Sequence, residues 1–204
     1  MKAKEKLYNF IAHSGINIMH RCFPEYFATE PLRPTDRYVE YPWALTSIPR
    51  GSKILDVGCA GSMFPLLINS LYGRVWGIDI RPHPMAGEFY FLRGDICNSN
   101  HLDTWFDVVT AISTIEHIGI GGRYGVVPHA EGDAKAIKEI YRILKPGGMF
   151  LMTVPFGEEY RITPTHRIYN ASMMETLLHD FDYEYETVPS PEADYELALI
   201  KAVK

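Results

Sequence analysis

Two acidic residues accompany a glycine-containing turn in the first half of the chain. A short apolar run ends in Asp56, Gly58 and Gly61 follow it, and a second apolar run ends in Asp79. This order is typical of a strand, a tight turn and a helix, in which the glycines leave room for a ligand against the backbone. Asp79 follows the turn by about 20 residues, where a nucleotide-binding βαβ unit places a carboxylate for two ribose hydroxyls. The pattern therefore predicts the binding of an adenosine-containing ligand.

The charge of Asp56 narrows the choice of that ligand. This carboxylate precedes the first glycine by two residues, at the mouth of the expected crevice, and it would repel a pyrophosphate. A ligand with an ammonium and a sulfonium would be favoured. S-adenosylmethionine has both, together with a ribose diol for Asp79. The alternative for the two acids is a cap at a strand end, but their joint occurrence at this spacing favours ligand binding.

Three of the eight histidines lie in segments expected to surround a reacting centre. His117 and His166 each follow a predicted strand, and His129 lies in the glycine-rich segment 119–129. A histidine can act as a general base toward a hydroxyl or amine because its pKa lies near physiological pH. All three are candidates for that role, and the sequence does not choose between them. The alternatives are packing around the ligand for His117, an exposed loop position for His129 and loop hydrogen bonds for His166.

Several further side chains have open roles. Four could bind an anionic substrate, with a solvated surface position as the default for each: Arg123, Tyr124, Arg161 and Arg167. The aromatic segment 38–43 is either a lid, with Tyr38 or Tyr41 at the methionine end of the ligand, or a cap over the sheet edge. Carboxylates and histidines occur near positions 116–133, but they lack a dedicated ligand spacing, so no metal site is predicted.

The elements that must position these residues alternate from residue 53 onward. Strands are expected at 53–58, 74–79, 89–93, 106–112, 148–154, 183–188 and 195–203. Helices are expected at 62–71, 133–144 and 171–181, with Asp133 as an N-cap and a short helix near 101–105. This alternation predicts an α/β protein with a doubly wound, mainly parallel sheet. The last two strands have no helix signal between them and should form an antiparallel hairpin.

The 204 residues are expected to form one domain overall. Residues 1–50 differ from the rest and are expected to be a helical and aromatic cap segment, in which prolines at 24, 31, 34 and 42 break any long helix. Residues 51–204 are expected to form the main Rossmann-like domain.

Composition and charge disfavour several functional classes. The net charge is −5 and no long basic run occurs, which disfavours nucleic acid as the main partner. The three cysteines show no disulfide or zinc spacing, which favours a reducing, cytoplasmic location. No apolar run approaches the roughly 20 residues of a membrane span, so no transmembrane segment is predicted.

Four segments in this order resemble the class I S-adenosylmethionine-dependent methyltransferases, from about residue 53 to the C-terminus. They are 54–61, 77–79, 106–109 with 115–117, and 144–151. The first departs from the commonest motif, since Ala60 stands where a second glycine usually falls and Gly61 follows it. The resemblance implies a seven-stranded Rossmann-like sheet with strand order 3-2-1-4-5-7-6, in which strand seven is antiparallel and helices cover both faces.

The resemblance also implies a set of residues that bind the cofactor. They are Asp56, Gly58, Cys59, Ala60, Gly61, Asp79, Ile80, Asp95, Ile96 and Ser113. Within this set, Asp95 is implied to face the adenine amino group and Ile96 to pack on the adenine ring. The alternative for Asp95 is a helix N-cap or a turn residue, and for Cys59 a small residue that fills a tight site.

The function implied is transfer of a methyl group from S-adenosylmethionine to a small-molecule acceptor, such as a hydroxyl of a sugar or another metabolite. Methyl transfer is an in-line displacement, so the protein mainly aligns the nucleophile and excludes water. Residues 113–116 do not match the Asn/Asp-Pro-Pro-aromatic motif of the family's DNA enzymes. Two alternatives are an NAD-dependent oxidoreductase, against which the missing G-x-G-x-x-G stands, and a non-catalytic S-adenosylmethionine-binding protein. The oligomeric state is left open.

Overall fold

The computed structural model describes residues 35–204 apart from 100, 102 and 122–127, together with helical positions between 10 and 22. The chain divides into two compact units, Met1–Arg33 and Pro34–Lys204. In the first unit, Phe10, Ile11 and Ile18 belong to helical positions and are largely exposed. Among the residues described, no helix is both long and apolar enough to cross a bilayer.

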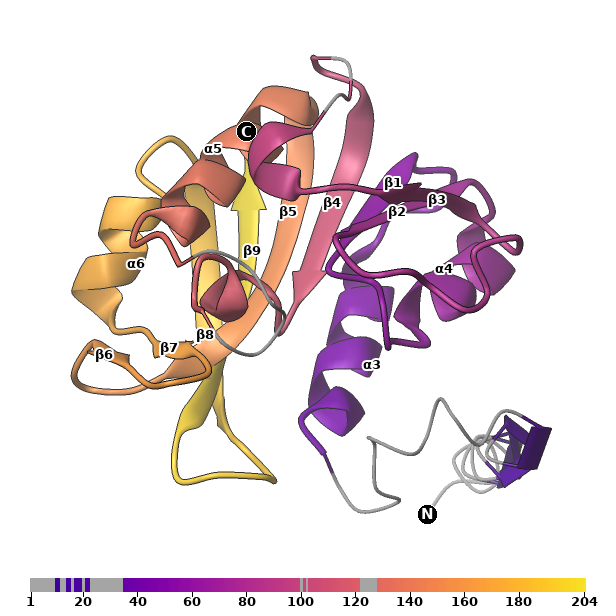
Figure 1. Cartoon of the computed structure of the whole chain (residues 1–204), viewed down its shortest axis with the longest axis horizontal. Helices are drawn as coiled ribbons and strands as arrows, with labels where there is room; N and C mark the ends of the chain where they lie inside the picture. The colour runs from indigo at the N-terminus through magenta and orange to yellow at the C-terminus, as the bar shows by residue number, and fades with distance from the viewer. Residues whose placement is uncertain are drawn as a thin grey trace. The chain divides into compact units, whose positions relative to one another are not determined.

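A seven-stranded sheet forms the centre of the second unit (Figure 1). Its order is β3-β2-β1-β4-β5-β9-β8. The strands are β1 (Ile54–Val57), β2 (Val75–Asp79), β3 (Tyr90–Arg93), β4 (Phe106–Ile112), β5 (Leu144–Phe156), β8 (Asp182–Pro189) and β9 (Glu196–Val203). The first five pair in parallel, whereas β9 is antiparallel to both β5 and β8. The predicted strand order and the terminal hairpin are therefore confirmed.

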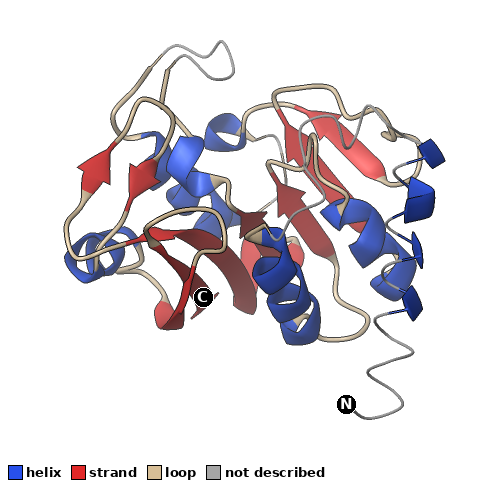
Figure 2. Cartoon of the chain, turned by 90° about the horizontal axis from the view of Figure 1, so that it is seen from below, coloured by secondary structure: helices blue, strands red, loops and turns tan. Residues whose placement is uncertain are grey.

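Helices cover both faces of this sheet (Figure 2). They are α3 (Arg37–Ser47), α4 (Phe64–Tyr72), α5 (Gly132–Ile143) and α6 (Ala171–Leu177), with the short 3-10 helices η1 (Ile96–Asn98) and η2 (Ile115–His117). Alternate residues of a strand point to opposite faces, so each central strand contributes to two cores. In β4, Val109 and Ala111 pack in the core that contains α5 and α6, and Val108 packs in the core that contains α3 and α4. A separate two-stranded ribbon consists of β6 (Arg161–Ile162) and β7 (Arg167–Ile168).

The predicted N-cap of α5 is wrong. Glu131 is the N-cap, and Asp133 lies inside the first turn, where it is buried. The end of the helix was predicted within one residue, because α5 ends at Ile143 and β5 begins at Leu144.

The predicted short helix near 101–105 is also wrong for the residues described there. The amides of Thr104 and Trp105 donate to the carbonyls of Arg142 and Ile143, at the end of α5. These bonds satisfy carbonyls that a helix leaves without intrahelical partners. Thr104 has a φ of +51°, which a helical segment does not accommodate.

The aromatic segment 38–43 is helical rather than broken by proline, since α3 continues through Pro42. The helix packs against the core that contains α4, in which Ala44 is fully buried. Tyr41 stacks on Phe64 with a ring-centroid distance of 4.8 Å, and Tyr38 is 56% exposed. Neither tyrosine lines the pocket described below. The segment therefore caps a face of the sheet, and the lid interpretation is not supported.

Candidate functional site

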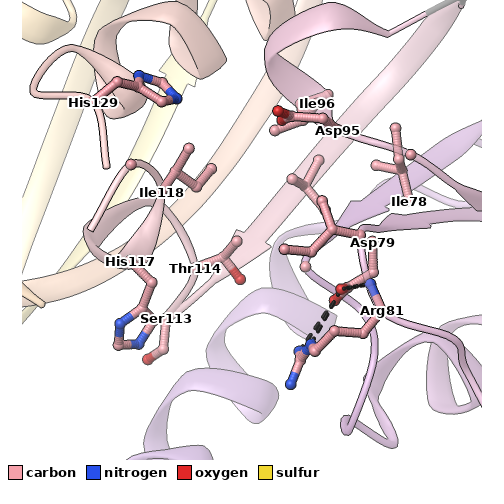
Figure 3. Close-up of a pocket in the computed structure, with 15 residues that line it drawn as sticks. Ile78, Asp79, Arg81, Asp95, Ile96, Ser113, Thr114, His117, Ile118 and His129 are labelled. Atoms are coloured by element: carbon pink, nitrogen blue, oxygen red, sulfur yellow. Dashed lines mark hydrogen bonds and ion pairs between the residues drawn. The ribbon is translucent and has the colours of Figure 1, made fainter. Parts of the chain in front are cut away.

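A pocket of about 350 Å³ lies at the carboxyl ends of β1, β2 and β4, between the residues labelled in Figure 3. Its volume falls within the range of small-ligand sites, roughly 300–1,000 Å³. In open α/β sheets, ligands bind outside the carboxyl ends of the strands, where the strand order reverses. Here the order reverses between β1 and β4. Eight predicted site residues line the pocket: Gly58, Asp79, Ile80, Asp95, Ile96, Ser113, His117 and His129.

The glycine turn after β1 approaches the loop after β4 very closely. Gly58 has a φ of +75°, which a side chain disfavours, and its amide donates to the carbonyl of Ile78 at 2.9 Å. A Cβ atom placed on Gly58 would lie 2.3 Å from Cγ2 of Thr114. Two walls of the pocket therefore depend on the absence of a side chain at this position. The sequence did not single out Thr114, because nothing local to it indicates contact with the turn.

Three other turn residues predicted to bind the ligand do not line the pocket: Cys59, Ala60 and Gly61. Cys59 is buried, with its Sγ 2.8 Å from the point where a Cβ of Gly77 would lie. Burial raises the pKa of the Cys59 thiol. This supports its interpretation as a small residue that fills a tight site. The amide of Ala60 donates to Oδ2 of Asp79 at 2.8 Å, which joins the turn to the end of β2.

Asp79 is the best-anchored carboxylate of the pocket. It is 6% exposed. Besides the bond from Ala60, its Oδ1 accepts from the amide of Arg81 at 2.8 Å and its Oδ2 forms an ion pair with Arg81 Nη2 at 3.2 Å (Figure 3). Arg81 Nη2 also donates to the carbonyl of Ala60 at 2.6 Å. Sequence reasoning missed Arg81, although its position two residues after Asp79 is the kind of signal that could have identified it.

Asp56, the other motif acid, does not line the pocket. It is buried beside Thr110 of the neighbouring strand β4, and its Oδ1 accepts from the Thr110 hydroxyl at 2.7 Å. The pKa of Asp56 is raised to about 7, chiefly because burial disfavours the charged form. The Thr110 hydrogen bond lowers this pKa and the nearby charge of Asp79 raises it, each by less than burial does. Asp56 is therefore not placed to contact the ammonium of a ligand in this pocket.

The raised pKa of Asp56 predicts a pH dependence of stability. An aspartate in the unfolded chain titrates near about 3.9, whereas Asp56 in the folded protein titrates at about 7. Between these values the folded state binds more protons than the unfolded state, so the free energy of unfolding should fall as the pH rises from about 4 to 7. Urea unfolding across this range should show that component in the native protein. It should be missing in Asp56→Asn, and an identical pH profile in the variant would contradict the assignment.

Asp95 is a helix cap, as one of its predicted alternatives has it, and it also lies in the pocket wall. Its Oδ1 accepts from the amide of Cys97 at 2.9 Å, so it caps η1, and it also lines the pocket. Ile96 is 5% exposed and lines the same wall. A polar group and an apolar side chain therefore stand next to each other at the end of the pocket formed after β3.

Two of the three candidate histidines line the pocket, and the third lies behind one of them. His117 Nδ1 is 2.7 Å from the carbonyl of Thr165, so Nδ1 donates. Its Nε2 lies 3.6 Å from Oε1 of Glu116. The ring of His166 lies 6.2 Å from that of His117 and contacts the hydroxyls of Thr163 and Thr165. This arrangement agrees with the loop-holding alternative for His166, which does not line the pocket.

His129 lines the pocket from the end of a loop that a backbone hydrogen bond closes. Its amide donates to the carbonyl of Gly119 at 3.0 Å, which brings the two ends of segment 119–129 together. Its Nδ1 is buried and has no hydrogen-bond partner within the described part of the chain. A buried polar atom without a partner costs free energy, so a pocket ligand that bonds to it would be stabilised.

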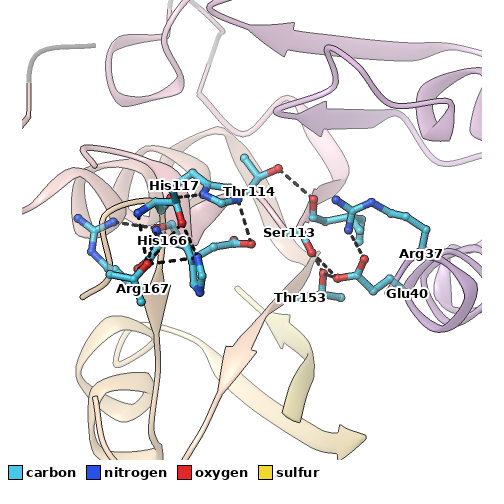
Figure 4. A network of polar contacts seen from close by, with 12 residues as sticks. Arg37, Glu40, Ser113, Thr114, His117, Thr153, His166 and Arg167 are labelled. Carbon is cyan, nitrogen blue, oxygen red and sulfur yellow. Dashed lines mark hydrogen bonds and ion pairs between the residues drawn. The ribbon is translucent and has the colours of Figure 1, made fainter. Parts of the chain in front are cut away.

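The prediction that Arg167 could bind an anionic substrate is wrong. Arg167 is fully buried and forms an ion pair with Asp133 at 3.2 Å. Its guanidinium also donates to the carbonyls of Ile118 and Ala130 at 2.7 and 3.2 Å, on either side of segment 119–129 (Figure 4 shows its surroundings). Arg167 therefore holds the loops that carry His117 and His129. Arg161 is exposed, and Arg123 and Tyr124 lie outside the described residues.

Within the described ranges, no three His, Cys, Asp or Glu side chains come together as a metal site.

Strand order and pocket position together define the Rossmann-like α/β fold of class I methyltransferases. The crystal structure of 1,6-didemethyltoxoflavin-N1-methyltransferase from Burkholderia thailandensis superposes with a TM-score of 0.69 at 16% identity, over 100% of this chain and 91% of that one. A Neurospora crassa sterol 24-C-methyltransferase is 31% identical over 56% of this chain and 30% of its own length. An Arabidopsis thaliana tRNA (carboxymethyluridine(34)-5-O)-methyltransferase is 30% identical over 66% of this chain and 32% of its own length.

The chain thus matches about a third of the length of these two curated relatives. The methyltransferase resemblance predicted from the motifs is confirmed by these relatives and by the fold. The chain belongs to the family described as "Caenorhabditis protein of unknown function, DUF268", whose model matches residues 95–199.

Proposed function

We propose that the chain binds S-adenosylmethionine in this pocket and transfers its methyl group to a small-molecule acceptor. The observation that carries the proposal is Asp79, a buried carboxylate fixed by the glycine turn at the carboxyl end of β2. In nucleotide-binding βαβ units, a carboxylate at this place bonds the ribose hydroxyls.

The residues present fit this cofactor along the length of the pocket. Asp79 can accept from the ribose diol in place of the Arg81 side chain, which bonds both of its oxygens at 3.2 Å. Asp95 can accept from the adenine amino group, and Ile96 can pack on the ring. Ser113, in the loop after β4, lies on the wall that remains for the methionine portion. The narrow turn at Gly58 fits a ligand that lies against backbone.

When bound, S-adenosylmethionine supplies a methyl carbon activated by a sulfonium. The protein has to hold the acceptor in line with that carbon, exclude water and accept the acceptor's proton. His117 Nε2 and His129 are the pocket groups able to take a proton from an acceptor hydroxyl. The proposed acceptor is a hydroxyl of a sugar or of another metabolite. The net charge of −5 favours such a small-molecule acceptor over a nucleic acid, whose phosphates bind basic surfaces.

Calorimetric titration of the chain with S-adenosylhomocysteine and, separately, with NAD tests the proposal. We expect saturable binding of S-adenosylhomocysteine and no binding of NAD. Preference for NAD would favour the oxidoreductase alternative instead. A chain that binds S-adenosylmethionine tightly but methylates no hydroxyl or amine acceptor in a metabolite extract would be a cofactor-binding protein without catalysis.

A further inference from the structure

Glu40 is a buried carboxylate that reaches the pocket wall from outside the nucleotide-binding motifs. It lies in α3 and is 0% exposed. Its Oε1 accepts from the hydroxyls of Ser113 and Thr153, each at 2.5 Å, and its Oε2 forms an ion pair with Arg37 (Figure 4). Ser113 is 73 positions away in the chain and lines the pocket. Glu40 therefore connects α3 to a residue that a ligand would meet.

The backbone at Ser113 is held in an unusual conformation by the same network. Its φ is +45°, which is uncommon for a residue other than glycine. The Ser113 amide donates to Oγ1 of Thr153 at 2.9 Å, and Thr153 in turn donates to Glu40. Strained residues persist when their surroundings determine them, and they concentrate at ligand sites. Glu40 is therefore the anchor of this conformation as well as the partner of the Ser113 hydroxyl.

The direction of the Ser113 bond determines what its hydroxyl can offer to a ligand. A serine hydroxyl has one proton and two lone pairs. Because a carboxylate accepts only, the proton of Ser113 is committed to Glu40, and only lone pairs remain for the pocket. A ligand group that contacts Ser113 Oγ must consequently be a hydrogen-bond donor.

We infer that Glu40 is a positioning residue that makes Ser113 a hydrogen-bond acceptor for the ammonium of a bound S-adenosyl compound. This rests on the proposed function, in which Asp79 and Asp95 hold the adenosine portion and the amino-acid portion extends toward Ser113. Asp56, which the motif had indicated for the ammonium, does not line the pocket. Ser113 lines the pocket, and its Oγ, which donates its proton to the Glu40 carboxylate, can accept a hydrogen bond from the ammonium.

The substitution Glu40→Gln reverses this polarity without changing the size of the side chain. Arg37 can only donate, so the amide oxygen of glutamine faces Arg37 and the amide nitrogen faces Ser113 and Thr153. The Ser113 hydroxyl then accepts from the amide, and its proton turns toward the pocket and the ammonium.

The test compares S-adenosylhomocysteine with its deaminated analogue, which keeps the carboxylate and lacks only the amine. Calorimetry on the native chain should show a preference for S-adenosylhomocysteine of about tenfold or more, the size of a hydrogen bond with a charged partner. Glu40→Gln and Ser113→Ala should each bring the two affinities to within about twofold of each other, since the contact to the amine is lost.

Asp36→Asn is the matched control. Asp36 is likewise a buried carboxylate that accepts from a serine hydroxyl, that of Ser190 at 2.7 Å, but neither residue lines the pocket. This variant should keep the native preference. Thermal unfolding of all variants shows whether each is folded, and Ser113→Ala keeps the test valid if Glu40→Gln fails to fold.

The outcomes separate the two proposals. A native chain that binds neither compound contradicts the proposed function itself. A native chain that binds both equally, or folded Glu40→Gln and Ser113→Ala variants that retain the native preference, overturns the role of Glu40 and leaves cofactor binding in place. Equal weakening of both compounds in the two variants would mean that the network is merely structural, and it would also overturn the inference.

Discussion

Replacement of Gly58 by valine is expected to abolish the binding of S-adenosylhomocysteine. The φ of +75° at this position disfavours any side chain, and a Cβ there would lie 2.3 Å from Thr114 Cγ2 and 2.9 Å from Thr114 Cβ. Thr114 cannot turn away at no cost, because its hydroxyl donates to the carbonyl of Ile112 at 3.0 Å. The valine would thus displace the turn or the loop after β4, and both form walls of the pocket.

The control for Gly58→Val is Gly51→Val. Gly51 also has a positive φ, +81°, but no atom lies within 4 Å of the point where its Cβ would be. Both variants should share the backbone strain, about 1–2 kcal/mol of unfolding free energy, while only Gly58→Val should lose the ligand. Calorimetry gives the binding result, and urea unfolding gives the stability. Normal affinity in a folded Gly58→Val variant would show that the ligand does not depend on this close approach.

Replacement of Asp79 by alanine is expected to weaken S-adenosylhomocysteine binding by about 100-fold or more. Hydrogen bonds to a charged group contribute roughly 1.5–3 kcal/mol each, and the ribose diol can donate two. The variant should also lose about 1–3 kcal/mol of stability, because the buried amide of Ala60 is left without an acceptor. Asp79→Asn keeps one acceptor oxygen and should lie between the native chain and the alanine variant.

A modified ligand makes the Asp79 test specific for the ribose. The 2′-deoxyribose form of S-adenosylhomocysteine should bind the native chain more weakly than the parent compound. Asp79→Ala should show no difference between the two ligands. If the alanine variant still discriminates between them, another group bonds the 2′-hydroxyl, and Arg81 would then be the first side chain to test.

Much of the fold could be predicted because its signals are local. Continuous apolar runs predicted the central strands β4 and β5, and the missing helix signal before β9 predicted the terminal hairpin. The helix α3 could not be predicted, because Pro42 is a local signal against it and the burial that stabilises it comes from distant residues. The expected helix near residue 103 failed for a similar reason, since its amides bond to the end of α5.

The pocket shows the same division between local and distant signals. Gly58 and Asp79 could be assigned to it because a positive φ favours glycine and because a βαβ unit fixes the place of the second acid. Arg167 could not be assigned, because an arginine in a loop is exposed by default and its partner Asp133 lies in another element. The place of Asp56 could not be predicted either, because its side chain accepts a hydrogen bond from Thr110 of the neighbouring strand.

By itself, the sequence determined the order of strands and helices, the glycine turn and the acid that ends β2, since each depends on residues close together in the chain. Only the tertiary structure decided which side chains line the pocket and which form their hydrogen bonds or ion pairs with other protein groups. Ser113 received its acceptor character from Glu40, 73 positions earlier. No local pattern encodes such a pairing, because it arises only when packing of α3 against the sheet excludes water and leaves the two side chains as each other's partners.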